Sequence, residues 1–156
     1  MRRGRRLGID VGEVRIGVAS CDPDGLIATP VETVPARDGD PIARIAALVR
    51  EYEAIECVVG LPVSLSGREG AAAAKARDFA ARLVPAIPGV SVRLVDERMS
   101  TVTASSQLRA SGRKAKSSRS VIDQAAATVI LQTALDAERT RGSAPGELLD
   151  DGIETT

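Results

Sequence analysis

The alternation of apolar and polar residues in the first part of the chain predicts three consecutive β-strands. Residues 5–20 read RRLGIDVGEVRIGVAS, where apolar positions alternate with small or polar ones on both sides of a break at Gly12-Glu13. This arrangement is typical of a hairpin with a tight turn. The turn signal DPDG follows, and LIATPVETV at 26–34 predicts a third strand. Pro30 indicates that this strand is at an edge or contains a bulge.

Helical spacing and short apolar runs alternate through the rest of the chain. Asp40 followed by Pro41 is typical of a helix start, because Asp caps free amides and Pro fits the first turn. The compact run IECVVGL predicts a buried central strand, and VSVRLV predicts a further strand. The predicted helices span 41–53, 71–83, 101–108 and 120–139, and these two strands span 55–61 and 90–95.

This order of elements predicts an α/β fold with a mixed five-stranded sheet. An antiparallel β-β-β unit followed by right-handed β-α-β crossovers places helices on both faces. A chain of 156 residues fits one domain with its own core, which we expect over residues 1–140. Gly, Ser, Pro and acidic residues dominate residues 141–156, so we expect a disordered acidic tail there.

The composition excludes several classes of chemistry. The chain has no His, which removes Ser-His-Asp and Cys-His nucleophiles and the usual His zinc sites. One Tyr, one Phe and no Trp argue against the base-stacking platforms of RRM and OB domains. Cys21 and Cys57 form no CxxC pair, so we expect two reduced thiols, with a disulfide-linked dimer as the alternative. Without a signal or membrane-spanning stretch, we expect a cytoplasmic protein.

Charge is unevenly distributed, although the formal net charge is zero. A neutral total gives no global field that attracts nucleic acid, but it does not exclude a basic face. The segment 109–119 contains basic residues and no acidic residue; its members are Arg109, Arg113, Lys114, Lys116 and Arg119. Such a cluster is either a solvated loop or a surface that faces nucleic acid.

Three acidic residues occupy positions that are unusual for a structural role. Asp10 interrupts an apolar strand, where an unpaired carboxylate is costly. Glu97 directly follows a predicted strand, at the sheet edge where α/β proteins bind ligands. Asp123 lies beside the apolar stripe of the last helix. The alternatives are a local turn bond for Asp10, a pair between Glu97 and Arg98, and an i−4 pair between Asp123 and residue 119.

Together, the three acids predict a metal site. Carboxylates that lie close together repel one another, and divalent cations relieve this repulsion. Such a cluster can hold two Mg²⁺ or Mn²⁺ ions about 4 Å apart, the arrangement used for phosphodiester cleavage. Asp96 is a candidate further ligand, or an acceptor for groups around the site.

Four motifs, in this order, resemble the YqgF/RuvX family of Holliday-junction-resolvase-like proteins, also described as pre-16S rRNA nucleases. They are GIDVGEVRIGVA at 8–19, GLP at 60–62 with Gly67, DERMST at 96–101, and VIDQAAATVILQ at 121–132. The motifs extend over nearly the whole predicted domain, but they leave the N-terminal arginines and the acidic tail uncovered.

The resemblance implies an RNase H-like fold with sheet order 3-2-1-4-5 and a metal-dependent endonuclease activity. The family's acidic residues correspond to Asp10, Glu97 and Asp123, the three residues already singled out as a catalytic and metal-binding set. Arg15 and Arg98 lie within the motifs and are expected to contact the scissile phosphate as bidentate donors.

The basic segment is the expected nucleic-acid-facing loop, where contacts to phosphate rather than to bases predominate. Its predicted nucleic-acid-binding residues are Arg113, Lys114, Lys116 and Arg119. Members of the family often have Lys-Gly before the Val-x-Asp run, whereas this chain has Arg119-Ser120, which keeps the charge and reduces the freedom of the turn.

The sequence leaves three functions open and argues against a fourth. The leading prediction is 5′-end processing of pre-16S rRNA; a Holliday junction resolvase is the closest alternative and requires a homodimer. An actin-like phosphotransferase needs a second domain that this chain is too short to contain. A non-catalytic RNA-binding assembly factor retains the fold without the activity, since fold does not imply function.

Overall fold

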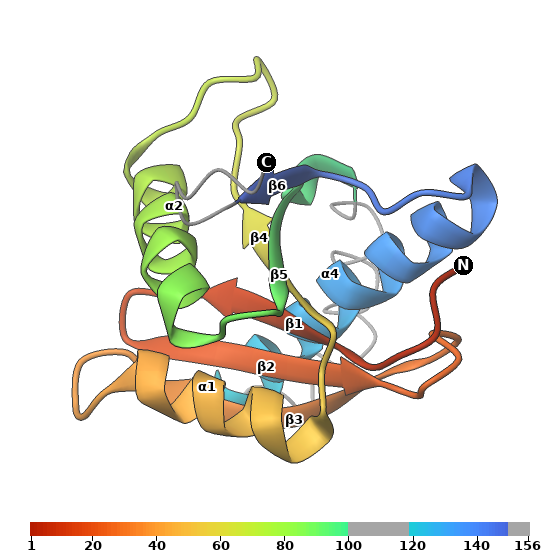
Figure 1. Cartoon of the computed structure of the whole chain (residues 1–156). Coiled ribbons are helices and arrows are strands. Elements are labelled where there is room, and N and C mark those ends of the chain that lie inside the picture. The colour runs from red at the N-terminus through yellow and green to blue at the C-terminus, as the bar shows by residue number, and fades with distance from the viewer. Residues whose placement is uncertain (100–118, 150–156) are drawn as a thin grey trace.

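The computed structural model describes residues 1–99 and 119–149, which form a six-stranded sheet with helices on both faces (Figure 1). The strands are β1 (Arg6–Val11), β2 (Arg15–Cys21), β3 (Ala28–Pro35), β4 (Glu56–Leu61), β5 (Ser91–Asp96) and β6 (Glu147–Leu149). The helices are α1 (Pro41–Tyr52), α2 (Ala71–Leu83) and α4 (Arg119–Arg141), with short 3-10 turns η1 (Val84–Ala86) and η2 (Glu97–Met99). The helix predicted over 101–108 lies outside the described residues.

The strand order is β3-β2-β1-β4-β5-β6. β1, β2 and β3 pair antiparallel, β4 lies parallel to β1 and β5, and β6 is antiparallel to β5. The predicted α/β fold and the order 3-2-1-4-5 are therefore confirmed. Pro30 lies in edge strand β3, next to a register irregularity opposite Val18 and Ala19, which agrees with both readings of that proline.

The prediction of five strands is wrong, because a sixth strand forms within the expected tail. Leu149 pairs with Val92 and packs against the core, while Glu147 binds Arg77. Three residues are too short to show a strand periodicity, and their pairing partner is distant in the sequence. The domain consequently includes residues up to Leu149.

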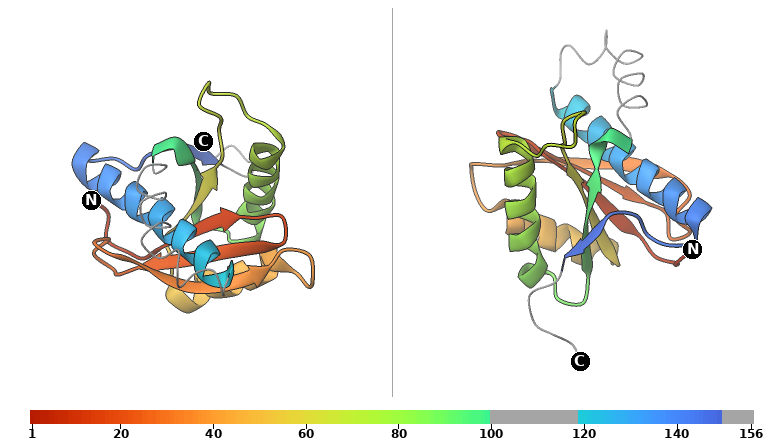
Figure 2. Two further views of the ribbon diagram at one scale, coloured as in Figure 1. Left: turned by 180° about the vertical axis from the view of Figure 1, so that it is seen from behind. Right: turned by 90° about the horizontal axis from the view of Figure 1, so that it is seen from above.

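Strand alternation divides the interior into two cores. Leu7 and Ile9 of β1 face α1 and α2, whereas Val58 and Val95 pack with α4 on the opposite face. Figure 2 shows α2 and α4 on opposite sides of the sheet. Because Asp10 follows Ile9, its side chain is placed on the α4 face.

Both thiols are free and buried, Cys21 on the α4 side of the sheet and Cys57 on the other. Their burial does not favour a disulfide-linked dimer. Within the described ranges, no helix combines the length and apolarity needed to cross a bilayer.

A buried ion-pair cluster fastens the N-terminal segment to α4 and the sheet. Arg6 is 1% exposed and donates to Glu138 at 2.9 Å, and Arg2 donates to Glu138 at 2.6 Å and to Glu56 at 2.9 Å. Arg93 of β5 also binds Glu56, at 2.8 Å. The N-terminal arginines, for which the sequence suggests no role, are thus part of the folded structure.

Candidate active site

The sheet topology brings the three predicted acids to one edge. β1, β4 and β5 are parallel, so Asp10 near the end of β1 and Glu97 directly after β5 lie at the same edge. Ligands of α/β proteins bind at this edge. Asp123 reaches it from the first turns of α4, which crosses the same face of the sheet.

Glu97 contacts Asp10 across the intervening strand β4. The two carboxyl groups are hydrogen-bonded to one another, and this contact contributes to the raised pKa of Glu97. Gly60 of β4 makes room for this contact, because a Cβ there would lie 2.5 Å from Glu97 Oε1 and 2.6 Å from Ile130 Cδ1. Gly60 is therefore a part of the site.

Both of these carboxyl groups ionise at higher pH than usual. Burial, followed by the charge of Asp123, raises the pKa of Asp10 to about 6. Burial, followed by the charge of Asp10, raises the pKa of Glu97 to about 7. The molecule thus holds like charges close together and partly out of water, an arrangement that a divalent cation would relieve.

Asp123 is held by Arg15. The Arg15 Nε donates to Asp123 Oδ2 at 3.2 Å, and both side chains are partly exposed. Gly17 of β2 seats this part of α4, since a Cβ at Gly17 would clash with the carbonyl oxygen of Asp123. Asp123 is therefore close enough for its charge to act on Asp10, while one of its own oxygens is engaged by a guanidinium.

The side chains at this edge suit a divalent cation chemically, but the three acids do not surround a single point. Within residues 1–99 and 119–149, no three acidic side chains are arranged to hold one ion. The hydrogen-bonded pair Asp10 and Glu97 offers hard oxygen donors that suit Mg²⁺ or Mn²⁺. Arg15 bonds only one oxygen of Asp123, Oδ2, so the other carboxylate oxygen is the candidate donor from this residue.

Arg98 pairs with Asp96 rather than with Glu97. Its Nε and Nη2 donate to the Asp96 carboxylate at 2.9 and 2.5 Å, and this pairing lowers the pKa of Asp96. Asp96 therefore holds a guanidinium beside Glu97. Of the other predicted nucleic-acid-binding residues, Arg113, Lys114 and Lys116 lie outside the described residues, and Arg119 is the first residue of α4.

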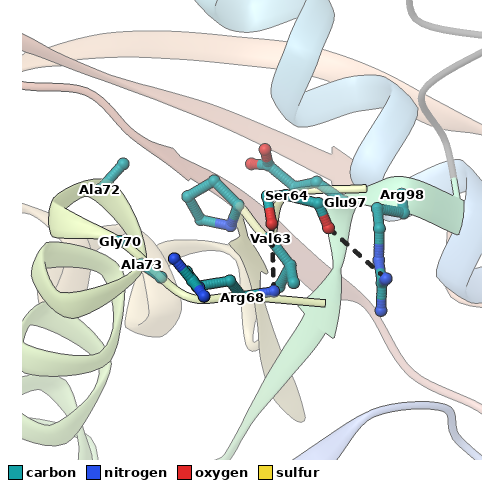
Figure 3. Close-up of a pocket in the computed structure, with 9 residues that line it drawn as sticks. Val63, Ser64, Arg68, Gly70, Ala72, Ala73, Glu97 and Arg98 are labelled. Atoms are coloured by element: carbon teal, nitrogen blue, oxygen red, sulfur yellow. Dashed lines mark hydrogen bonds between the residues drawn. The ribbon is translucent and has the colours of Figure 1, made fainter. Parts of the chain in front are cut away.

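A pocket of about 320 Å³ adjoins the carboxylates (Figure 3). Glu97 and Arg98 line one side, and Ser64, Arg68 and the start of α2 line the rest. Arg68 could not be predicted as a residue of this pocket, because a single basic residue in a Ser- and Gly-containing loop has no periodic signal. Glycine within a buried strand was an available signal for Gly60.

The fold and this edge define the chain as an RNase H-like α/β protein. Solved structures with a similar fold include *Thermus thermophilus* RuvC in complex with a Holliday junction substrate, at TM-score 0.62 and 16% identity, covering 91% of this chain and 99% of that one. A second *T. thermophilus* RuvC structure matches at TM-score 0.57 and 17% identity, covering 92% and 99% of the two chains.

Sequence comparison gives the family. Residues 4–137 match the model of RuvX, described as Holliday junction resolvase. Relatives named "Putative pre-16S rRNA nuclease" occur in *Streptomyces avermitilis* (66% identity, 94% of this chain and 95% of the relative) and *Thermobifida fusca* (57%, 96% and 98%). The chain belongs to the RuvX family.

Proposed function

We propose that this chain is a metal-dependent endonuclease that hydrolyses phosphodiester bonds of structured nucleic acid, and that it processes the 5′ end of pre-16S rRNA in the cytoplasm. The observation that carries the proposal is the hydrogen-bonded carboxyl pair of Asp10 and Glu97, with the charge of Asp123 beside it. The names of relatives with 57–66% identity along nearly their whole length support the substrate.

The proposed ligands are Asp10, Glu97 and Asp123, which would hold one or two Mg²⁺ or Mn²⁺ ions. Bound metal would supply Lewis-acid stabilisation of the phosphate and an activated water. The chain's own contribution is to hold two carboxyl groups at the ends of neighbouring parallel strands and a third on α4. Glu97 would bind a cation in its carboxylate form.

Arg15 and Arg98 are the proposed phosphate contacts. Arg98 directly follows Glu97 in the sequence and is oriented by its ion pair with Asp96. Arg15 is oriented by its ion pair with Asp123. A guanidinium held in this way presents its remaining N–H groups to a phosphodiester with little loss of side-chain entropy. Arg15 would thus keep its place beside a cation held by the carboxylates and offer its remaining N–H groups to the substrate.

A second candidate is a Holliday junction resolvase, favoured by the description of the family and by the fold shared with RuvC. Resolution of a four-way junction requires two active sites, so this candidate requires a homodimer. The junction and the precursor RNA therefore form the two arms of one experiment.

We expect the wild-type chain, supplied with Mg²⁺ or Mn²⁺, to cut a 5′-labelled precursor 16S rRNA fragment near the mature 5′ end, because relatives along nearly the whole chain are named for that substrate. The measurement is product mapping on a sequencing gel, with a four-way DNA junction run in parallel and with EDTA as control. Paired symmetric nicks in the junction alone would assign the resolvase function. If both substrates stay intact with either metal, the endonuclease proposal fails for them and a binding factor becomes the better account.

A further inference from the structure

The loop between β4 and α2 is built as a short hairpin that fixes the backbone at Arg68. Val63 and Glu69 form an antiparallel bridge, and the Ser64 amide donates to the Arg68 carbonyl at 3.0 Å. The Arg68 amide donates in turn to Ser64 Oγ at 3.1 Å. These bonds fix the backbone at Arg68, whose side chain lines the same pocket as Glu97.

Among the basic side chains that the structure describes at this edge, Arg68 differs in having no acidic partner. Arg15 is paired with Asp123, Arg98 with Asp96, and Lys75 with Glu13. Across residues 1–99 and 119–149, the Arg68 guanidinium forms no ion pair. Its positive charge is thus available to an anion.

The start of α2, which lies beside Arg68, also favours an anion in this pocket. Figure 3 shows its guanidinium beside Gly70 and Ala73 at the start of α2, with Glu97 and Arg98 across the pocket. The first turn of α2 contains no acidic side chain, and Gly70 has none with which to cap its amides. Free amides at a helix start add positive potential to that of the guanidinium.

We propose that this pocket binds a backbone phosphate of the nucleic acid strand next to the scissile phosphate, and that Arg68 is its positioning residue. The inference rests on the proposed function, since it assigns a second phosphate contact to the same substrate. Glu97 belongs to the carboxyl pair and also lines the pocket, so a strand held by Arg68 lies next to the carboxylates. The contact is to phosphate and gives no base specificity.

The test is fluorescence anisotropy of a labelled precursor rRNA fragment, without divalent metal, over a series of salt concentrations. We expect Arg68→Ala to weaken binding about fivefold to tenfold and to reduce the slope of log K against log salt by roughly 0.7–0.9, which is one phosphate contact. Arg68→Lys should recover part of the affinity, because charge remains while the fork of donors is lost.

Arg50→Ala is the matched control. Arg50 is an exposed arginine in the last turn of α1, at the opposite edge of the sheet, so its loss removes the same charge away from the pocket. Its slope and affinity should equal those of the wild type. If Arg68→Ala and Arg50→Ala behave alike, the inference is wrong.

Two further arms separate the possible sources of phosphate and the two proposals. If millimolar inorganic phosphate displaces the RNA from the wild type but not from Arg68→Ala, the RNA occupies the Arg68 pocket, as proposed. If phosphate binds the wild type through Arg68 and leaves the RNA bound, the pocket is a free-anion site and the strand contact is contradicted. Because the assay needs no cleavage, a wild type that cuts RNA with an unchanged Arg68→Ala slope would overturn this inference alone. A wild type that cuts nothing, with a reduced Arg68→Ala slope, would overturn the proposed function alone.

Discussion

Asp10→Asn should lower the rate of cleavage at least about a thousandfold, equivalent to about 4 kcal/mol of transition-state stabilisation. Asn keeps the size of the side chain and removes the charge and one oxygen ligand. Because Asp10 is hydrogen-bonded to Glu97 and lies within the field of Asp123, its loss affects the whole proposed metal site. Single-turnover cleavage of the precursor RNA, at saturating Mn²⁺, measures the effect.

Thermal unfolding gives the same substitution a second readout. The wild type should gain roughly 5–10 °C in Tm at a hundredfold excess of metal over its Kd, and Asp10→Asn should gain little. Without metal, Asp10→Asn should be the more stable protein, since one of the repelling charges has gone. Asp136→Asn, at the far exposed part of α4, is the control and should match the wild type in both assays. Full cleavage by Asp10→Asn would remove this residue from the catalytic set.

Glu138→Ala should destabilise the fold by about 3–5 kcal/mol, the usual cost of removing one partner from a buried ion pair. The substitution leaves the guanidinium of Arg6, which is 1% exposed, without its carboxylate, and it removes one of the two acids that hold Arg2. Urea unfolding at pH 7 measures the loss. Glu32→Ala breaks the more exposed pair with Arg44 and should cost no more than about 1 kcal/mol.

The same residue gives a pH dependence of defined sign. The Arg2 and Arg6 guanidiniums hold the pKa of Glu138 at about 2, well below its ordinary 4.5. A lowered pKa contributes stability above pH 4.5 that is lost as the pH falls toward 2, about 3 kcal/mol in all. Unfolding of the wild type and Glu138→Gln should therefore differ most at neutral pH and converge near pH 2. A constant difference from pH 7 to pH 2 would contradict this assignment.

Much of the fold follows from local patterns. Alternation in β1 and β2, the Asp40-Pro41 helix start and the compact run at 55–61 predict the elements, and the right-handed crossover rule predicts helices on both faces. The sheet order 3-2-1-4-5 came from the family resemblance. Strand alternation also places the side chains of Ile9 and Asp10 on opposite faces of the sheet. Asp10 and Asp123 are predictable as site residues because they are acids beside apolar positions, and Glu97 is predictable because it directly follows a strand at the ligand-binding edge.

Features that depend on distant partners could not be predicted. The pairing of Arg15 with Asp123 and the bonds between Arg6 and Glu138 join residues more than a hundred positions apart. β6 has too few residues for a periodicity, and its partner strand is far away in the chain. In each case the contact arises from the packing of whole elements, for which a single sequence contains no local signal.

The most direct test of the metal site is anomalous diffraction from a crystal of the wild type soaked in Mn²⁺. We expect a peak bounded by the carboxylates of Asp10 and Glu97, with an oxygen of Asp123 in contact with it. Manganese bound elsewhere, or a manganese peak at saturating Mn²⁺ that no oxygen of Asp123 contacts, would contradict the three-carboxylate site on which the account depends.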